Sequence, residues 1–151
     1  MKEDAGNGKS ELQVMKESTI QMLKQYESLG ETRVQIVAFS DNYYGNQNAA
    51  NYTAWISVTA AISYVNGLNA GGGTDYDDAL WIANQTWDQS GRLSNASNIS
   101  YFLSDGEPTG SDRGNSNTIS QAEEGWWKTH LEQHDITAQS YGIGNNAPAE
   151  Y

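Results

Sequence analysis

The segment Ile-Ser-Tyr-Phe-Leu at residues 99–103, followed by Ser-Asp-Gly at 104–106, decides how this chain folds. A short apolar run bounded by polar residues is typical of a strand that is covered on both faces of a sheet. In open α/β sheets, binding sites lie beyond the carboxyl ends of such strands. The segment therefore predicts a buried strand and makes Asp105 a candidate site residue.

A second loop, Gly-Gly-Gly-Thr-Asp at residues 71–75, precedes a segment whose apolar residues recur at helical spacing. Glycines allow the backbone to pass close to a bound ion without Cβ clashes, and hard divalent cations take hydroxyl and carboxylate oxygens as ligands. Thr74 and Asp105 are therefore candidate metal ligands. The alternatives are that Thr74 only caps the following helix and that Asp105 is an ordinary turn residue before Gly106.

The rest of the chain alternates between helical and strand patterns. Helices are expected between Ser10 and Gly30, over 60–68, after the 71–75 loop, and after Thr118; strands are expected over 34–39, 52–58, 99–103 and 136–141. This alternation predicts an α/β fold, a three-layer sandwich with a mostly parallel central sheet. Residues 1–151 form a single domain, with a loop or frayed end over 1–9 and a polar tail over 142–151.

Composition excludes several classes of function. The net charge is −11, with 8 Lys and Arg against 19 Asp and Glu, which argues against nucleic acid and anionic membrane surfaces as partners. No apolar run has the length of a membrane span, and the absence of cysteine removes thiolate chemistry. His130 and His134 have the spacing of a zinc pair but lack the intervening glutamate of metalloproteases. No enzymatic function is expected.

The two loops, together with the order of elements from Gly8 to Gly144, resemble the von Willebrand factor A (vWA) family, in the bacterial form found in large repeat-containing, RTX-like surface adhesins. The family's metal-ion-dependent adhesion site uses a Thr from one loop and an Asp from another. The resemblance implies that Thr74 coordinates the metal and that Asp105 holds it through a water molecule. The residues expected as a possible acidic rim are Asp4, Asp41, Asp75 and Glu107.

The chain departs from the family pattern at one point. The first strand and its Asp-x-Ser-x-Ser loop, which hold most of the site's ligands, are absent, and the last helix also is expected to be missing. In the family, the absent strand lies between the strands expected at 34–39 and 99–103. We therefore expect an incomplete vWA domain, either excised from a longer domain or completed by a strand from a second chain or from the parent protein.

The resemblance implies a cation-dependent protein-binding module, in which Mg²⁺ or Ca²⁺ bridges to a carboxylate of a protein partner. The ion is expected to bind weakly or incompletely to this segment. The alternative is a structural spacer of a long adhesin with a degenerate metal site. In both cases the expected location is extracellular or at a bacterial cell surface.

Overall fold

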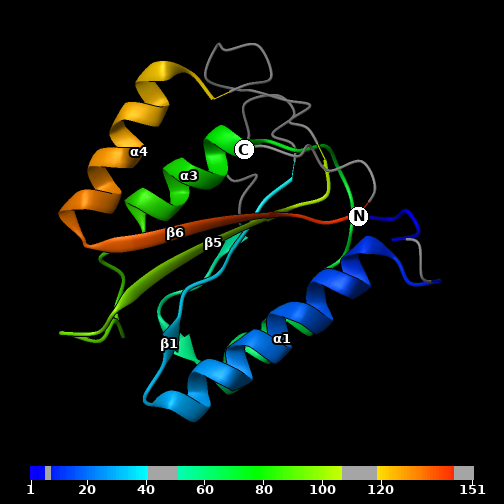
Figure 1. Ribbon diagram of the computed structural model, residues 1–151, viewed down its shortest axis with the longest axis horizontal. Coiled ribbons are helices and arrows are strands. Elements are labelled where there is room, and N and C mark those ends of the chain that lie inside the picture. The colour runs from blue at the N-terminus through cyan, green and yellow to red at the C-terminus, as the bar shows by residue number, and fades with distance from the viewer. Residues whose placement is uncertain (6–7, 41–50, 107–118, 145–151) are drawn as a thin grey trace.

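The computed structural model describes residues 1–5, 8–40, 51–106 and 119–144 of the chain. These residues form an α/β fold of helices and short strand pairs (Figure 1). The elements in chain order are α1 (Glu11–Leu29), β1 (Arg33–Val34), β2 (Val37–Ala38), β3 (Asn51–Tyr52), β4 (Ile56–Ser57), α2 (Val58–Gly67), α3 (Tyr76–Gln85), β5 (Asn98–Ser104), α4 (Gln121–Gln133) and β6 (Ile136–Gly142).

Local capping chemistry sets where the helices begin. The side chain of Ser10 accepts a hydrogen bond from the backbone N–H of Gln13 at 3.2 Å, which confirms Ser10 as the N-cap of α1. Ser120 and Glu123 form a reciprocal capping box at the start of α4. The sequence placed that cap at Thr118, which lies outside the described residues. Each cap satisfies backbone N–H groups that have no partner within the helix.

The pair formed by β5 and β6 confirms the strands expected over 99–103 and 136–141. The two strands are parallel, in register from the pair Asn98 and Ile136 to the pair Ser104 and Gly142. Beyond the last pair, the N–H of Ile143 donates to the carbonyl of Ser104 at 2.8 Å. Among the described strand pairs, β5–β6 is the one that is parallel, and its ladder is the longest.

The expectation of one continuous strand over 34–39 is wrong. The structure has instead β1, antiparallel to β4, and β2, antiparallel to β3. Between them, the Ile36 N–H donates to the hydroxyl of Thr53 at 3.0 Å, and the Gln35 side-chain amide donates to the Thr53 carbonyl at 3.3 Å. The Thr53 N–H also donates to the Ile36 carbonyl at 3.0 Å. These bonds involve the Thr53 and Gln35 side chains in place of a regular ladder, and the strand expected over 52–58 is likewise divided into β3 and β4.

The helices lie on opposite sides of the β5–β6 pair. In Figure 1, α3 and α4 lie on one side and α1 on the other. A small core forms where Leu23 of α1 meets Val58 and Ala61 of α2, with half-buried apolar side chains of β1 and β4 against it. Within the described residues, no helix combines the length and the apolar character needed to cross a membrane.

A separate aromatic cluster joins α3 to α4. The Trp87 ring, which follows α3, lies 5.3 Å from that of Trp55 and 4.7 Å from that of His134, measured between ring centroids. Its neighbour His130 is buried and stacks on Trp127 at 5.2 Å. The side-chain contacts between the segment after α3 and α4 therefore include a buried histidine.

We expect the free energy of unfolding to decrease as the pH falls below about 6.5. Burial lowers the pKa of His130 below its ordinary value of 6.5; His134 acts in the same direction and Asp88 opposes it. The folded state thus binds fewer protons than the unfolded chain in this range, so unfolding becomes more favourable with acidification. Urea unfolding, followed by tryptophan fluorescence between about pH 5 and about pH 8, measures the slope. The variant His130→Gln should flatten the profile, and an unchanged profile would contradict the assignment.

Candidate metal site at the carboxyl edge of β5

Two loops that are distant in sequence meet at the carboxyl end of β5. The Asp75 N–H donates to the carbonyl of Ser40 at 3.0 Å, and the Tyr76 hydroxyl donates to the carbonyl of Gly106 at 2.6 Å. These bonds tie the 71–75 loop both to the segment after β2 and to the turn after β5. Thr74 and Asp105 line the same cavity. The structure therefore brings the two sequence-predicted ligands to one edge.

Three aromatic rings hold this edge together. Phe102 of β5 lies 4.8 Å from Tyr76 and 5.3 Å from Phe39, measured between ring centroids. Phe39 and Tyr76 are 6.2 Å apart in an edge-to-face arrangement. Edge-to-face and offset stacked contacts of this kind are favourable beyond the area that they bury. The position of the 71–75 loop is thus fixed by packing as well as by hydrogen bonds.

The start of α3 settles one alternative left open by the sequence. Asp75, not Thr74, is the N-cap, because its Oδ1 accepts from the Asp78 N–H at 3.2 Å. The hydroxyl of Thr74 is therefore not needed to cap the helix. Asp75, Asp77 and Asp78 are all buried, with exposed fractions of 0%, 2% and 5%. The sequence indicated that they favour the helix start electrostatically, but it did not indicate their burial.

Asp105 contacts a cation that belongs to the chain itself. Its Oδ2 forms an ion pair with the α-ammonium group of Met1, which also lies 3.5 Å from Oε2 of Glu11. The Glu11 side chain is only 4% exposed, against 19% for that of Asp105. Sequence reasoning missed Met1 and Glu11, because nothing in their local pattern indicates that they reach the turn after β5. The ammonium group takes the place of a cation between two carboxylates.

Of the other residues expected in the acidic rim, Asp75 is the buried N-cap of α3. Asp4 lies in an exposed turn, where its Oδ1 accepts from the Gly8 N–H at 3.0 Å. Asp41 and Glu107 fall outside the described residues. Within the described parts of the chain, no set of three or more acidic or histidine side chains is arranged to hold a metal ion.

The chemistry of the donors nevertheless suits a hard cation. Thr74 offers a hydroxyl oxygen and Asp105 a carboxylate, the ligand types that Mg²⁺ and Ca²⁺ take. Mg²⁺ and Ca²⁺ each require about six or more oxygen ligands. Most of these ligands would therefore be water molecules or groups outside the described residues. A cation at Asp105 would also have to displace the Met1 ammonium group.

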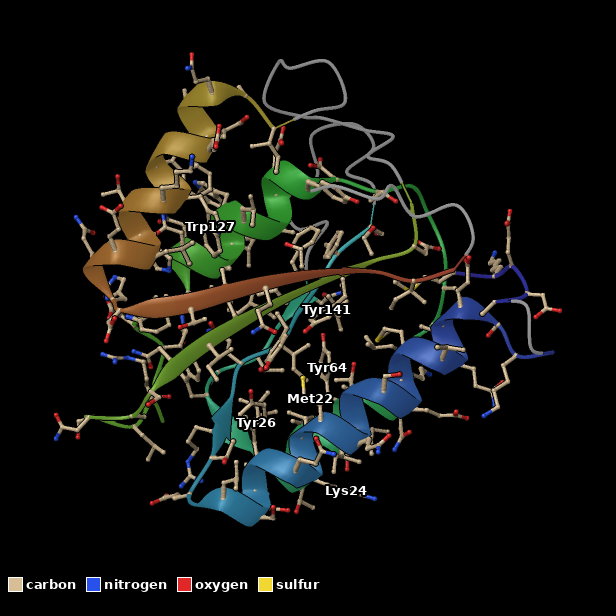
Figure 2. The ribbon with its side chains drawn as sticks, in the orientation of Figure 1. Met22, Lys24, Tyr26, Tyr64, Trp127 and Tyr141 are labelled. Carbon is tan, nitrogen blue, oxygen red and sulfur yellow. The ribbon has the colours of Figure 1, made fainter. Side chains whose placement is uncertain are left out.

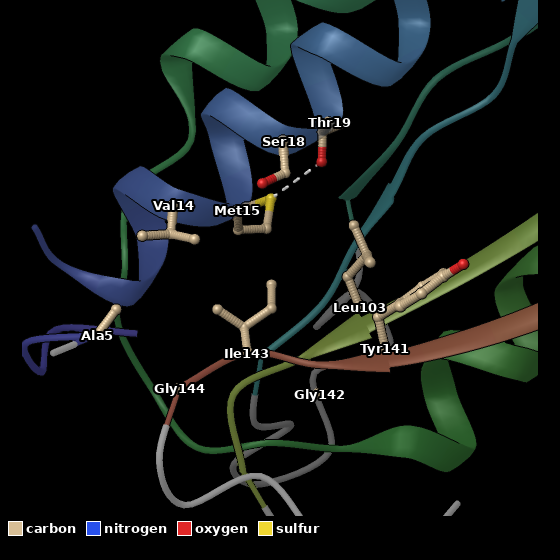
Figure 3. Close-up of a pocket in the computed structure, with 10 residues that line it drawn as sticks. All are labelled: Ala5, Val14, Met15, Ser18, Thr19, Leu103, Tyr141, Gly142, Ile143 and Gly144. Atoms are coloured by element: carbon tan, nitrogen blue, oxygen red, sulfur yellow. Dashed lines mark hydrogen bonds between the residues drawn. The ribbon is translucent and has the colours of Figure 1, made fainter. Parts of the chain in front are cut away.

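A smaller apolar hollow adjoins this edge. Figure 3 shows it between the first turns of α1 and the ends of β5 and β6, with a volume of about 400 Å³. Met15, Thr19 and Leu103 line both this hollow and the larger cavity at Thr74 and Asp105. The Thr19 hydroxyl donates to the Met15 sulfur at 3.6 Å. Ser18 and Tyr141 contribute hydroxyl groups to an otherwise mainly apolar lining.

Comparison with known protein families gives a match over most of the chain. The model of the von Willebrand factor type A domain matches residues 5–151, so the chain belongs to the vWA family. Comparison with curated proteins and with solved structures gave no match. The vWA domain is an α/β fold and commonly serves as a protein-interaction module.

Substituting Gly144 should destabilise the protein by about 1–3 kcal/mol. Gly144 has a φ of +92°, a conformation that side chains disfavour, and a Cβ there would collide with the Glu11 carboxylate. Gly144→Ala must therefore displace the Glu11 side chain. As a control, Gly125→Ala meets nothing within 4 Å in α4 and should stabilise by about 0.5–1 kcal/mol. Urea unfolding compares them, and equal effects of the two substitutions would contradict this account.

Proposed function

We propose that the chain is a divalent-cation-dependent protein-binding module, in which a cation at the carboxyl edge of β5 bridges to a carboxylate of a partner protein. The observation that carries the proposal is the convergence of Thr74 and Asp105 on one cavity, from loops 30 residues apart. Membership of the vWA family supports it. The edge also lies where open α/β sheets form their sites.

The chain's own residues have distinct roles in this function. Asp105 supplies the negative charge that attracts the ion, and Thr74 supplies a neutral oxygen. When bound, the cation supplies an open coordination position for the partner's carboxylate. The Met1 ammonium group competes with the ion for Asp105, so affinity is set by the difference between two electrostatic interactions. Neither role involves bond cleavage, and we include in the proposal that the chain is not an enzyme.

The chain would act outside a bacterial cell, as part of a surface or secreted protein such as a large adhesin. The charge of −11 is suited to surroundings that contain free divalent cations. Ca²⁺ tolerates larger and less regular oxygen shells than Mg²⁺, which needs near-octahedral geometry and retains its water. Ca²⁺ is therefore the better candidate for a site with few protein ligands.

A specific observation favours a second function, that of a structural spacer with a degenerate metal site. The Asp105 carboxylate is already neutralised by the Met1 ammonium group, and Glu11 shares that charge. An edge that satisfies its own carboxylates does not require a metal ion for stability. In this case the domain contributes length and rigidity to its parent protein, without capturing a ligand.

Calorimetric titration with Ca²⁺ and Mg²⁺ distinguishes the two functions. The chain should bind Ca²⁺ weakly and Mg²⁺ more weakly still, because it supplies few ligands. Thr74→Ala and Asp105→Asn should each reduce the Ca²⁺ affinity roughly tenfold or more, as the loss of groups around a metal typically does. The matched control is Asp135→Asn, since Asp135 precedes β6 and lies at the opposite edge of the parallel pair. It should leave the affinity unchanged.

Acetylating the N-terminus provides a second arm, because it removes the competing charge of Met1. The acetylated chain should bind Ca²⁺ roughly twofold to fivefold more tightly, the range that a partly exposed ion pair contributes. This gain should disappear in Asp105→Asn. If neither the chain nor its acetylated form binds Ca²⁺, or if Thr74→Ala and Asp105→Asn match the parent, the spacer function holds instead.

A further inference from the structure

Both histidines of the chain lie at the end of α4. The sequence contains two His and no Cys, so every imidazole of the chain is found here. His130 is in the last turn of the helix, and His134 is the C-cap, whose backbone N–H donates to the His130 carbonyl at 3.2 Å. This bond continues the helical turn as far as residue 134. Because residues four apart on a helix share a face, the two imidazoles lie one turn apart on the same side of α4.

The separation of the two rings fits a shared metal ion. Their centroids are 4.8 Å apart, and the ring planes are inclined at 61°. Zn–N bonds of about 2.0–2.1 Å place an ion about 3.2 Å from the centroid of each ring that binds it. For N–Zn–N angles between about 90° and about 110°, the two centroids are then about 4.5–5.2 Å apart. The helix therefore need not deform to bring both rings to one ion.

Tryptophan side chains hold the two rings in place. His130 is buried, with the Trp127 ring stacked on it at 5.2 Å and the Trp87 ring edge-to-face at 5.5 Å. The Trp87 ring also lies 4.7 Å from that of His134. Figure 2 shows Trp127 on the side of α4 that is turned toward α3. Because packing already restricts the rotamers, little side-chain entropy is lost when an ion binds.

The ring nitrogens of the pair are available as ligands. Within the described residues, neither His130 nor His134 takes part in a side-chain hydrogen bond. Polar atoms in a protein interior normally have a partner, and an ion shared by the two rings provides one for a nitrogen of each. His134 is half-buried, so solvent reaches its ring, and an ion that binds there lies next to His130.

The charges around the pair favour a cation on balance. Burial, followed by His134, lowers the pKa of His130, and the charge of Asp88 opposes both. The exposed carboxylate of Asp88 is thus near enough to attract a cation to the pair. Arg92 lies over the Trp87 ring, 5.0 Å from its centroid, and acts in the opposite direction. The chain as a whole carries a charge of −11, which raises the local concentration of cations.

The chemistry of the donors selects the class of ion. Imidazole nitrogen suits Zn²⁺, Cu²⁺ and Ni²⁺, whereas Mg²⁺ and Ca²⁺ take oxygen ligands. Two protein ligands leave open positions that water can fill. The residues between the two histidines do not include the glutamate of the metalloprotease pattern, so this arrangement indicates metal binding and not hydrolysis.

We propose that His130 and His134 bind one divalent transition-metal ion, Zn²⁺ or Cu²⁺, with water in the remaining positions. The Asn98 side-chain amide donates to the His134 carbonyl at 2.8 Å, so the site lies at the amino end of β5, opposite Thr74 and Asp105. The two nitrogens are brought together only when α4 is folded, so the ion stabilises the native state. The proposal does not depend on cation binding at the carboxyl edge of β5.

Calorimetric titration of the intact chain with Zn²⁺ tests the proposal. One ion should bind per chain, and excess Ca²⁺ or Mg²⁺ should not displace it. His134→Phe keeps an aromatic ring beside Trp87 but removes the nitrogen ligand, and it should weaken Zn²⁺ binding at least about tenfold. Its unfolding midpoint without metal reports whether the variant folds. Binding of Zn²⁺ by His134→Phe as tightly as by the parent overturns the proposal.

A change of spacing separates chelation from nonspecific binding to imidazole. The double variant Glu132→His with His134→Gln keeps two histidines but places them two residues apart, on different faces of the helix. It should bind Zn²⁺ as weakly as His134→Gln alone. Parent-like affinity of the double variant contradicts a site that requires both rings.

Removing charges tests the surroundings of the pair. Asp88→Asn should weaken Zn²⁺ binding several-fold, because it removes the nearby negative charge. The matched control is Glu27→Gln, which removes an exposed charge from α1 and should leave the affinity unchanged. Equal effects of the two substitutions contradict the placement of the ion beside His130.

Quenching of tryptophan fluorescence by Cu²⁺ gives an independent readout. A paramagnetic ion at the pair should quench strongly, since the rings of Trp87 and Trp127 contact the two histidines. Cu²⁺ should bind more tightly than Zn²⁺. Acetylating the N-terminus should leave the quenching unchanged, which excludes the Met1 amine as the ligand. Quenching that persists in His134→Phe, or that disappears on acetylation, overturns the proposal.

The two cation sites of the chain can fail separately. Asp105→Asn should leave Zn²⁺ binding unchanged, and His134→Phe should leave Ca²⁺ binding unchanged. Loss of Zn²⁺ binding in Asp105→Asn would place the ion at the carboxyl edge of β5 and overturn the assignment to the histidines.

Discussion

The architecture depends on how the backbone groups of β5 are satisfied. A strand with apolar side chains on both faces must be covered by helices and paired along both edges, because unpaired backbone groups and exposed apolar surface are unfavourable. Here β5 has β6 on one side, and a cavity on the other. Among the described residues, the β1–β4 and β2–β3 pairs are each two residues long, and the two strands of each have only each other as a partner.

In place of a continuous sheet, side-chain contacts link the two halves of the described structure. The rings of Phe39, Tyr76 and Phe102 connect β2, α3 and β5 at the carboxyl edge. At the other face, the hydroxyls of Tyr26 and Tyr101 form a hydrogen bond. This bond is the largest of the causes that raise the pKa of Tyr101 to about 12. Aromatic residues suit these positions, because each ring covers a large area and makes directional contacts.

The electrostatics of the carboxyl edge show how an acidic chain accommodates its own charge. Carboxylates of Asp75, Asp77, Asp78, Glu11 and Asp105 gather near one end of the sheet. The N-terminus of α3 favours negative charge beside it, and the Met1 ammonium group lies between Glu11 and Asp105. A buried carboxylate is tolerated only with such partners.

The sequence by itself determined the helices, the strands β5 and β6, and the position of Thr74 and Asp105 at strand and helix ends. These features depend on local signals: apolar spacing, a serine cap at Ser10, and a polar turn after an apolar run. Tertiary structure alone decided the break in the strand at Gln35 and Ile36, the burial of Glu11, and the ion pair between Met1 and Asp105. Each of these arises from groups distant in sequence, such as Thr53 against Ile36, and no local pattern records which distant partner a backbone or charged group will meet.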